Sequence, residues 1–292
     1  MSFPTRPYGR TGHHSTLAVL GGATYWESDP KSTQESFDAA IAAGVNHLDI
    51  APTYGRAEAL AGPCVPAVRD RLFVGCKTAR RNAAGVRAQL EKSLGLLGCD
   101  YFDLYQAHGV ISMADLATRA DAFEAVLAAR SEGLCRFVGI TGHGPETPKA
   151  QAEAVRRYDL DTAMFPINAR LWGDAEYRRD AEALLTLCLD RNVGVLAIKA
   201  GAARPYPTDP EPGTWRVPWY EPIEEFDAIV TSVRFVLSVP GVTGVCTPSR
   251  LDLTATVIQA AKNYTPMDAE EFNATIAASM HEPLLGLPSS DL

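Results

Sequence analysis

Residues 72–109 read LFVGCKTARRNAAGVRAQLEKSLGLLGCDYFDLYQAHG, and this stretch decides the fold. A short apolar run, Leu72–Cys76, predicts a strand. Apolar residues then recur at helical spacing, at Val86, Leu90, Leu94 and Leu97. Gly98 ends this helix, and Tyr101–Gln106 forms a second apolar run. The order of strand, helix and strand predicts two neighbouring parallel strands joined by a helix.

The same alternation of strand and helix continues along the rest of the chain. The expected strands are Leu17–Leu20, Val45–Asp49, Leu72–Cys76, Tyr101–Gln106, Arg136–Ile140, Thr162–Ile167, Val193–Ile198 and Val242–Cys246. The expected helices lie over 32–44, 56–68, 86–97, 116–130, 149–158, 181–190, 224–237 and within 251–280. The first of these helices is expected to begin with a capping box, Ser32 with Glu35, and to end at Gly44.

Eight strand–helix units without a break in composition favour an α/β fold, the closed (β/α)8 or TIM barrel. An open, doubly wound sheet is the alternative, but such sheets usually have fewer strands. The first strand is also not followed by the G-x-G-x-x-G pattern of dinucleotide-binding open sheets. We therefore expect residues 1–292 to form a single barrel domain, with a short N-terminal β-hairpin over Tyr8–Leu17.

The composition is that of a soluble globular protein, with 292 residues, 46% hydrophobic and 21% charged. Lys and Arg number 27 against 35 Asp and Glu, and the net charge of −8 argues against nucleic acid as a main partner. No apolar run reaches the roughly 18 residues that suggest a membrane span, and the first residues lack the apolar segment of a secretory signal. The six cysteines form no C-x-x-C pair, so we expect buried, reduced thiols in a cytoplasmic protein.

Ionisable residues stand at the ends of three consecutive expected strands. Asp49 ends the second strand, Lys77 the third and His108 the fourth, and Tyr54 follows Asp49 in the next turn. The carboxyl ends of barrel strands share one face, where chemistry is usually found. Adjacent strands lie about 4.8 Å apart, so these four side chains are expected to converge at one mouth of the barrel.

This set suits proton donation to a carbonyl group that is becoming an alkoxide. An ordinary tyrosine has a pKa of about 10, and a nearby ammonium such as Lys77 favours the phenolate and lowers that pKa. Asp49 would hold the ammonium, and a neutral His108 would donate a hydrogen bond to the carbonyl oxygen. The competing interpretation is a structural Lys–Asp pair beside a packing tyrosine. Four such groups at adjacent strand ends favour the functional interpretation.

The string LDIAPTYG resembles the D-x-A-x-x-Y-G signature of the aldo-keto reductases, and FVGCKT, DLYQAHG and CRFVGITGHG resemble their strands three, four and five. The resemblance covers nearly the whole chain. It implies a (β/α)8 barrel that uses NADPH, less often NADH, to reduce aldehydes and ketones to alcohols or to catalyse the reverse reaction. Tyr54 would be the general acid, Lys77 and Asp49 would tune it, and His108 would orient the carbonyl.

The resemblance also implies a cofactor site across the barrel mouth. Its residues would be Ala23, Thr24, Asp49, Thr141, Gly142, Asn168, Lys199, Ser249 and Arg250. Thr141-Gly142 stands where the family often has Ser-Asn, and Lys199 stands where it often has an aromatic residue. Lys199 would contact the pyrophosphate or pair with an acid, and Ser249 and Arg250 would meet a 2′-phosphate. An apolar substrate pocket would take Tyr25, Trp26, Tyr54, His108, Trp172, Trp215 and Trp219, although each ring could equally fill the core.

Residues 203–222 form a Pro-rich loop that includes Trp215, Trp219 and Tyr220. Prolines at this density argue against regular structure. Because the loop follows a strand, it is expected at the carboxyl face, either as a functional lid or as a rigid surface loop. The segments ITGHG and VPWYEP resemble a less-studied branch of the family, of which some members carry a C-terminal cysteine cluster for iron–sulfur centres. No cysteine follows Cys246, so no cluster is expected.

Two other functions compete with carbonyl reduction. A metal-dependent hydrolase on the same barrel would use His47, Asp49, His108 and His143 as ligands. Against this hypothesis, Lys77 would repel the metal and Tyr54 would have no role. A non-catalytic sensor would bind NADP(H) and signal to a partner. The presence of all four residues of the expected catalytic set, Asp49, Tyr54, Lys77 and His108, argues against it. We expect a small-molecule carbonyl or alcohol substrate, no membrane association, and a monomer or small homo-oligomer.

Overall fold

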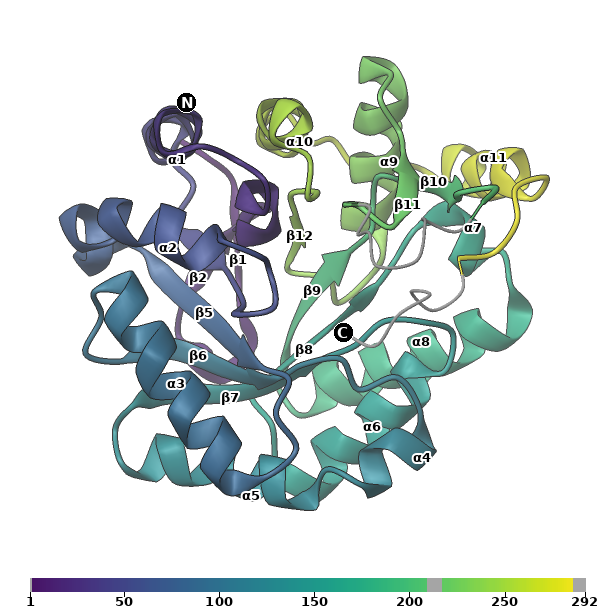
Figure 1. Ribbon diagram of the computed structural model, residues 1–292. Coiled ribbons are helices and arrows are strands. Elements are labelled where there is room, and N and C mark those ends of the chain that lie inside the picture. Colours follow the sequence, from purple (N-terminus) through teal and green to yellow (C-terminus); the bar gives the residue numbers. More distant parts are fainter. Residues whose placement is uncertain (1, 209–216, 286–292) are drawn as a thin grey trace.

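The computed structural model describes residues 2–208 and 217–285, and its centre is a closed barrel of parallel strands (Figure 1). The barrel strands are β3 (Ala18–Gly21), β4 (His47–Asp49), β5 (Phe73–Thr78), β6 (Phe102–Ala107), β7 (Cys135–Thr141), β8 (Thr162–Pro166), β9 (Gly194–Ile198) and β12 (Gly244–Cys246). Each pairs with the next in chain order, and β12 closes the barrel against β3. The predicted (β/α)8 barrel is confirmed, and the open sheet is ruled out.

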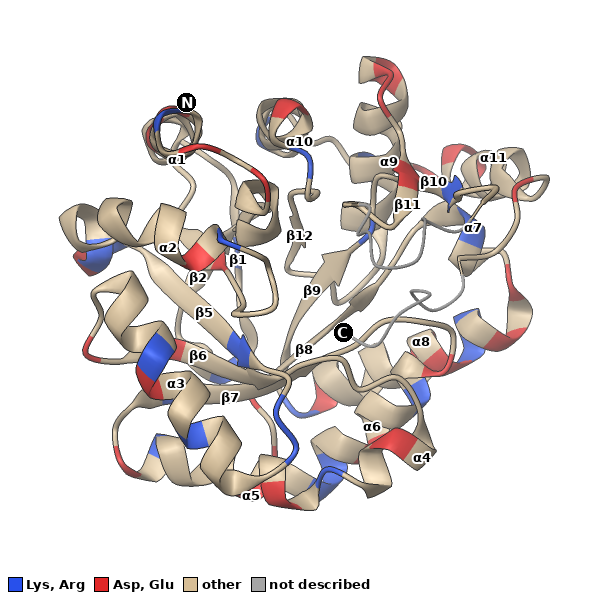
Figure 2. Cartoon of the chain, viewed as in Figure 1, with Lys and Arg blue, Asp and Glu red and all other residues tan. Residues whose placement is uncertain are grey.

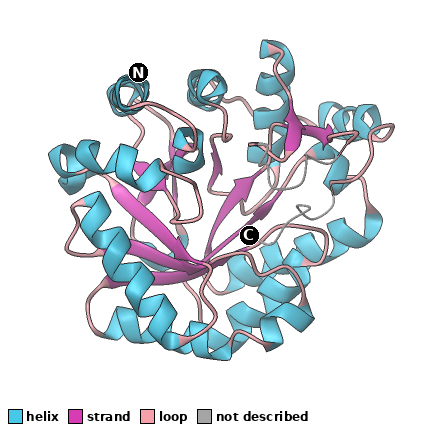
Figure 3. Cartoon of the chain, in the orientation of Figure 1, coloured by secondary structure: helices cyan, strands magenta, loops and turns pink. Residues whose placement is uncertain are grey.

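The helices surround the barrel and cover the outer face of its strands (Figure 3). They are α1 (Pro30–Ala43), α2 (Ala57–Ala61), α3 (Ala83–Leu97), α4 (Met113–Ala117), α5 (Ala120–Ser131), α6 (Thr147–Tyr158), α7 (Ala169–Trp172), α8 (Ala175–Asp190), α9 (Phe226–Ser238), α10 (Leu251–Lys262) and α11 (Ala269–Ser279). Charged residues of both signs are interspersed over these helices (Figure 2). Among the described residues, no helix is long and apolar enough to cross a membrane.

Three helix predictions need correction, and one of them, the single helix over 116–130, is replaced by α4 and α5. The N-cap of α1 is Asp29 rather than Ser32, because the Asp29 carboxylate accepts from the backbone N–H groups of Lys31 and Ser32 at 2.9 and 3.0 Å. The single helix expected over 56–68 is instead α2 followed by two short 3₁₀ helices, each with a proline at its start. A proline there cannot donate the hydrogen bond that would continue the α-helix.

The N-terminal hairpin closes the end of the barrel opposite the carboxyl ends of the strands. It pairs β1 (Thr5–Pro7) with β2 (His14–Thr16), so it begins three residues before the predicted Tyr8–Leu17. The Tyr8 ring enters the barrel interior, and Gly9 lies so close to β9 that an added Cβ would stand 2.2 Å from the Gly194 nitrogen. The hairpin therefore leaves only the opposite mouth for a site.

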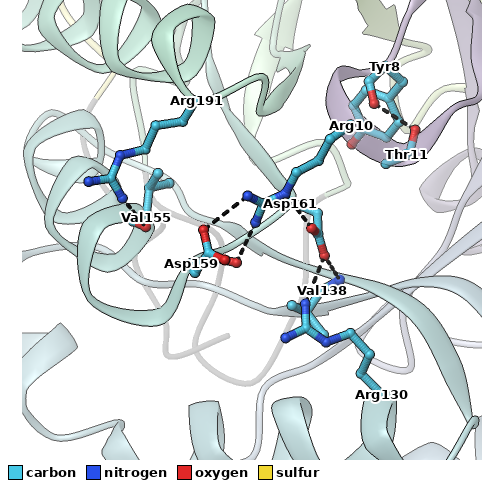
Figure 4. A network of polar contacts seen from close by, with 9 residues as sticks. All are labelled: Tyr8, Arg10, Thr11, Arg130, Val138, Val155, Asp159, Asp161 and Arg191. Atoms are coloured by element: carbon cyan, nitrogen blue, oxygen red, sulfur yellow. Dashed lines mark hydrogen bonds and ion pairs between the residues drawn. The ribbon is translucent and has the colours of Figure 1, made fainter.

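A charged network fixes this closure in place (Figure 4). Arg10 Nε donates to Asp161 Oδ1 at 2.7 Å, and Asp161 Oδ2 accepts from the Val138 N–H at 2.9 Å. Arg130 Nη1 on α5 also donates to Asp161, at 3.3 Å. One buried carboxylate thus joins the segment after β1 to β7 and α5.

The Pro-rich stretch contains regular structure, contrary to the expectation. Strands β10 (Ala202–Pro205) and β11 (Tyr220–Pro222) form an antiparallel pair at its base. Each strand ends on a proline, a position where the missing N–H interrupts little pairing. The middle of the loop, with the predicted pocket residue Trp215, lies outside the described residues.

The barrel interior below the mouth is mainly apolar, with His47 as a buried polar residue, and all six cysteines are buried and free, as predicted. The interior core is made by Tyr8, Val19, Phe73, Leu104, Met164, Leu196 and Cys246. Only the upper layer of the interior carries the charged pair described below.

Candidate active site

A cavity opens at the carboxyl ends of the barrel strands. The sequence-predicted residues that line it are Ala23, Trp26, Asp49, Tyr54, His108, Thr141, Lys199, Trp219 and Ser249. They come from segments spread over the whole barrel, as the shared face of parallel strands requires. The four residues Val217 to Tyr220 also line the cavity, so the described part of the Pro-rich loop forms one of its walls.

Lys77 and Asp49 form an ion pair beneath the cavity. Lys77 Nζ lies 2.5 Å from Asp49 Oδ2, and both side chains are buried. Lys77 also donates to the Ile50 carbonyl oxygen at 3.2 Å, and Gln106 Nε2 donates to Asp49 Oδ1 at 3.1 Å. Sequence reasoning missed Gln106, although it stands two residues before His108, which directly follows the strand β6. The period of two in a strand places both on one face.

The ion pair sets the charge next to Tyr54. Burial disfavours the Lys77 ammonium, but the Asp49 carboxylate outweighs burial and keeps the pKa of Lys77 above its usual range. Lys77 Nζ lies 5.0 Å from the centre of the Tyr54 ring. Burial nevertheless raises the pKa of Tyr54 to about 12, although Lys77 acts to lower it. The sequence predicted a lowered pKa for Tyr54, and this prediction is wrong. Burial raises the pKa by more than the Lys77 ammonium lowers it, so the phenol stays protonated.

His108 lies next to Tyr54 in the lining of the cavity. The two ring centres are 5.8 Å apart with an interplanar angle of 89°. Burial, helped by the cations Lys77 and Arg119, lowers the pKa of His108 well below its usual range, so the ring is neutral near pH 7. Thr53 Oγ1 contacts His108 Nδ1 at 3.3 Å, while His108 Nε2 has no hydrogen-bond partner among the described residues.

Arg119 positions the segment that carries His108. Its guanidinium donates to the carbonyl oxygens of His108 at 2.8 Å and Gly109 at 3.0 Å, and it pairs with Asp115 at 3.0 Å. Nothing in the spacing of the sequence pointed to Arg119. The residue stands between two short helices, α4 and α5, where the sequence predicted a single one.

Several buried polar atoms around the cavity lack a partner within the described part of the chain. They are His108 Nε2, Thr141 Oγ1, His143 Nδ1 and Lys199 Nζ. The His143 ring centre lies 5.6 Å from that of His108. Buried polar groups in proteins are nearly always hydrogen-bonded. A polar molecule bound in the cavity would give these four atoms hydrogen-bond partners.

Lys199 follows β9 and has no acidic partner among the described residues, so the alternative that it pairs with an acid is not supported. Its Nζ lies 4.0 Å from the centre of the Trp219 ring, in cation–π geometry. Its backbone has φ of 60°, in the left-handed region that residues other than glycine rarely adopt.

Four predicted cofactor residues do not line the cavity: Thr24, Gly142, Asn168 and Arg250. Thr24 Oγ1 contacts Thr254 Oγ1 at 2.8 Å in the interior. Gly142 allows a close backbone approach, since a Cβ there would stand 2.0 Å from the Val110 oxygen. Asn168 caps α7 and donates to the Lys199 carbonyl oxygen at 3.2 Å, so it supports Lys199 from behind.

Arg250 and two predicted pocket residues, Tyr25 and Trp172, have surroundings that differ from the predicted ones. The guanidinium of Arg250 is held by Asp252 at 2.6 Å and Glu224 at 2.9 Å, so its charge is already paired. The rings of Tyr25 and Trp172 belong to the hydrophobic core. Periodicity could not separate these core rings from Trp26 and Trp219, because an aromatic side chain serves either purpose.

The ligand set of the metal hypothesis is not brought together. His47 Nδ1 contacts Ser15 Oγ at 2.9 Å, and its ring packs on Tyr8 and Phe73 in the lower part of the barrel. Within residues 2–208 and 217–285, no group of three or more His, Cys, Asp and Glu side chains is placed to hold a metal ion. Asp49 instead holds Lys77.

The sequence of this chain resembles a known protein family and several known proteins. The aldo/keto reductase family model matches residues 18–203. An aldo-keto reductase of Mycobacterium sp. (strain KMS) is 32% identical over 129 residues, which are 43% of this chain and 46% of that protein. The uncharacterized oxidoreductase YqkF of Bacillus subtilis is 28% identical over 174 residues, 55% and 53% of the two chains. The chain thus spans about half the length of the curated relatives it matches.

A solved structure shares the fold over a larger part of the chain. The holo form of aldo-keto reductase AKR11C1 from Bacillus halodurans superposes with a TM-score of 0.72 at 21% identity, and covers 95% of this chain and 96% of that one. The family model matches well over half of the residues. The chain belongs to the aldo/keto reductase family.

Proposed function

We propose that the protein is an NAD(P)H-dependent oxidoreductase that reduces an aldehyde or ketone to an alcohol, or catalyses the reverse reaction, with Tyr54 as the general acid. The observation that carries the proposal is the meeting of Tyr54, His108 and the Lys77–Asp49 pair at one cavity. NADPH is the cofactor that we expect, and NADH is the alternative. The family membership supports nicotinamide chemistry in general.

The cavity offers groups that would hold the cofactor. Thr141 Oγ1 lacks a partner among the described residues, which fits a hydrogen bond to a carboxamide. Ala23 and Ser249 line the same cavity from the segments after β3 and β12. When bound, the cofactor supplies the hydride. Because Arg250 is already paired with two carboxylates, a preference for the 2′-phosphate of NADPH would require those ion pairs to rearrange.

His108 and Tyr54 would bind the carbonyl oxygen of the substrate. The contact of Thr53 with His108 Nδ1 leaves Nε2 facing no other group among the described residues, so Nε2 is the atom that would donate to this oxygen. Tyr54 keeps its proton at neutral pH because its pKa is about 12. An alkoxide is more basic than a phenolate, so proton transfer from Tyr54 is favourable as negative charge develops. The Lys77 ammonium then stabilises the phenolate.

Oxidation of NADPH and NADH against a panel of aldehydes and ketones tests this function. The wild-type protein should turn over at least one class, and Tyr54→Phe should lower the rate by roughly 10²- to 10⁴-fold, the usual contribution of general acid catalysis. Tyr158→Phe is the matched control, since Tyr158 stacks on Phe123 away from the cavity. Equal rates for Tyr54→Phe and wild type would overturn the mechanism. Cofactor binding without turnover of any carbonyl would favour the sensor hypothesis.

A further inference from the structure

Lys199 is a buried amine with no counter-ion among the residues that the structure describes. The charged residues in the described lining of the cavity are Asp49 and Lys199, and Asp49 is paired with Lys77. The Lys199 side chain lies in the wall of the cavity, only 8% of the residue is exposed, and its Nζ has no hydrogen-bond partner among the described residues. A charge buried without a partner is costly and is normally paired or hydrogen-bonded.

The position of Lys199 is imposed by its surroundings. Its backbone is held in the left-handed region, and its carbonyl oxygen accepts from Asn168 Nδ2 and from the Ala202 N–H, both at 3.2 Å. The Trp219 ring covers one side of the ammonium at 4.0 Å. Backbone strain of this kind persists where the surrounding structure enforces it, and it is concentrated at functional sites. Contacts to its backbone and the Trp219 ring thus hold Lys199 in the wall of the cavity.

Lys199 also lies near the groups that would handle the carbonyl. His143 lines the same cavity, and its ring packs on His108. Burial lowers the pKa of His143, and the nearby cation Lys199 lowers it further, ahead of His108 and Lys77. Lys199, His143 and His108 thus line one cavity. His143 Nδ1 likewise has no partner in the described structure and would add a second polar contact there.

We infer that the cavity takes a carbonyl substrate that carries an anionic group, such as a carboxylate, and that Lys199 binds this group. This inference rests on the proposed carbonyl reduction. The same chemistry could come from a phosphate of the cofactor. Lys199 lines the same cavity as His108 and His143, which would lie at the substrate carbonyl, and the experiments below distinguish the two sources. Burial lowers the pKa of the unliganded Lys199 well below its usual range, and a bound anion would restore the ammonium.

Matched pairs of substrates test the inference directly. We would measure kcat/KM for 4-formylbenzoate against its methyl ester, and for succinic semialdehyde against its methyl ester, because each pair differs chiefly in charge. The wild-type protein should prefer the acid at least tenfold in one or both pairs. Lys199→Met should abolish this preference by lowering kcat/KM for the acid at least tenfold, with less than a threefold change for the ester. Lys262→Met is the control, because Lys262 lies on α10 and donates to the Ala43 carbonyl oxygen.

Two further measurements separate the possible failures. Quenching of NADPH fluorescence gives the cofactor Kd. A weaker Kd in Lys199→Met, with equal losses for acid and ester, would overturn the inference in favour of a cofactor phosphate. No preference for either acid in the wild type would also overturn it. If the protein reduces no member of the full panel of aldehydes and ketones, the proposed function fails, and titration of 4-(hydroxymethyl)benzoate against benzyl alcohol still tests the anion site. Tighter, Lys199-dependent binding of the carboxylate supports the site, and equal binding of the two refutes it.

Discussion

Lys77 Nζ lies 2.5 Å from Asp49 Oδ2, and this buried pair is what keeps a positive charge beside Tyr54. Removal of one partner leaves the other charge buried and alone. We therefore expect Asp49→Asn to lower the free energy of unfolding by about 3–5 kcal/mol. Asp49→Asn/Lys77→Met should lose less stability than the sum of the two single variants. Urea unfolding followed by circular dichroism measures all three, and strictly additive losses would contradict the pairing.

The pH dependence of the reaction follows from the state of Tyr54 and His108. Burial raises the pKa of Tyr54 to about 12 and lowers that of His108 well below its usual range. Tyr54 is active with its proton and His108 without one. We expect kcat/KM for carbonyl reduction to stay level from about pH 7 to about pH 10, and to fall only above that range. A pH–rate profile measured in constant-ionic-strength buffers checks this. A decline between pH 8 and 9.5 that follows the ionisation of Tyr54 would contradict it.

Two tryptophans should respond differently to truncation. Trp219 lines the cavity and covers Lys199, whereas Trp172 is buried in the core. Trp219→Ala should raise KM several-fold and leave the protein folded. Trp172→Ala should lower the free energy of unfolding by about 3–5 kcal/mol. Thermal unfolding and steady-state kinetics on both variants distinguish the roles, and a stable Trp172→Ala protein with an altered KM would reverse the assignment.

The closed end of the barrel should govern stability without affecting chemistry. Gly9 has φ of 54°, and a Cβ there would stand 2.2 Å from the Gly194 nitrogen. Gly9→Ala should therefore be destabilising by more than the ~1 kcal/mol of a left-handed residue alone, because the hairpin must shift away from β9. At a temperature where the variant is folded, kcat should match the wild type. A lower kcat with unchanged stability would show that the hairpin influences the mouth.

The sequence predicted the barrel because strand and helix periods are local signals that repeat along the chain. It predicted Asp49, Tyr54, Lys77 and His108 at one place because parallel strands bring their carboxyl ends to a common face. The convergence of these four side chains was therefore predictable. The pKa of Tyr54 was not, because its burial depends on every segment around the mouth.

The remaining differences between prediction and structure have separate physical causes. Arg119 reaches the His108 carbonyl oxygen across a loop, and such long-range contacts leave no periodic trace in the sequence. Arg250 was expected to meet a phosphate; it forms ion pairs with Glu224 and Asp252 in this structure, and its contact with the cofactor stays a prediction. Tyr25 and Trp172 were assigned to the pocket because an aromatic residue has the same appearance in a core and in a cavity.

The single-turnover rate of NADPH oxidation tests the central claim, that Tyr54 donates the proton, most directly. Wild type, Tyr54→Phe and the control Tyr158→Phe would each be saturated with NADPH and mixed with an excess of an aldehyde that the wild type reduces. The rate of the Tyr54→Phe variant should be roughly 10²- to 10⁴-fold below that of the other two proteins, with the same Kd for NADPH. A Tyr54→Phe rate equal to the wild-type rate would contradict the claim.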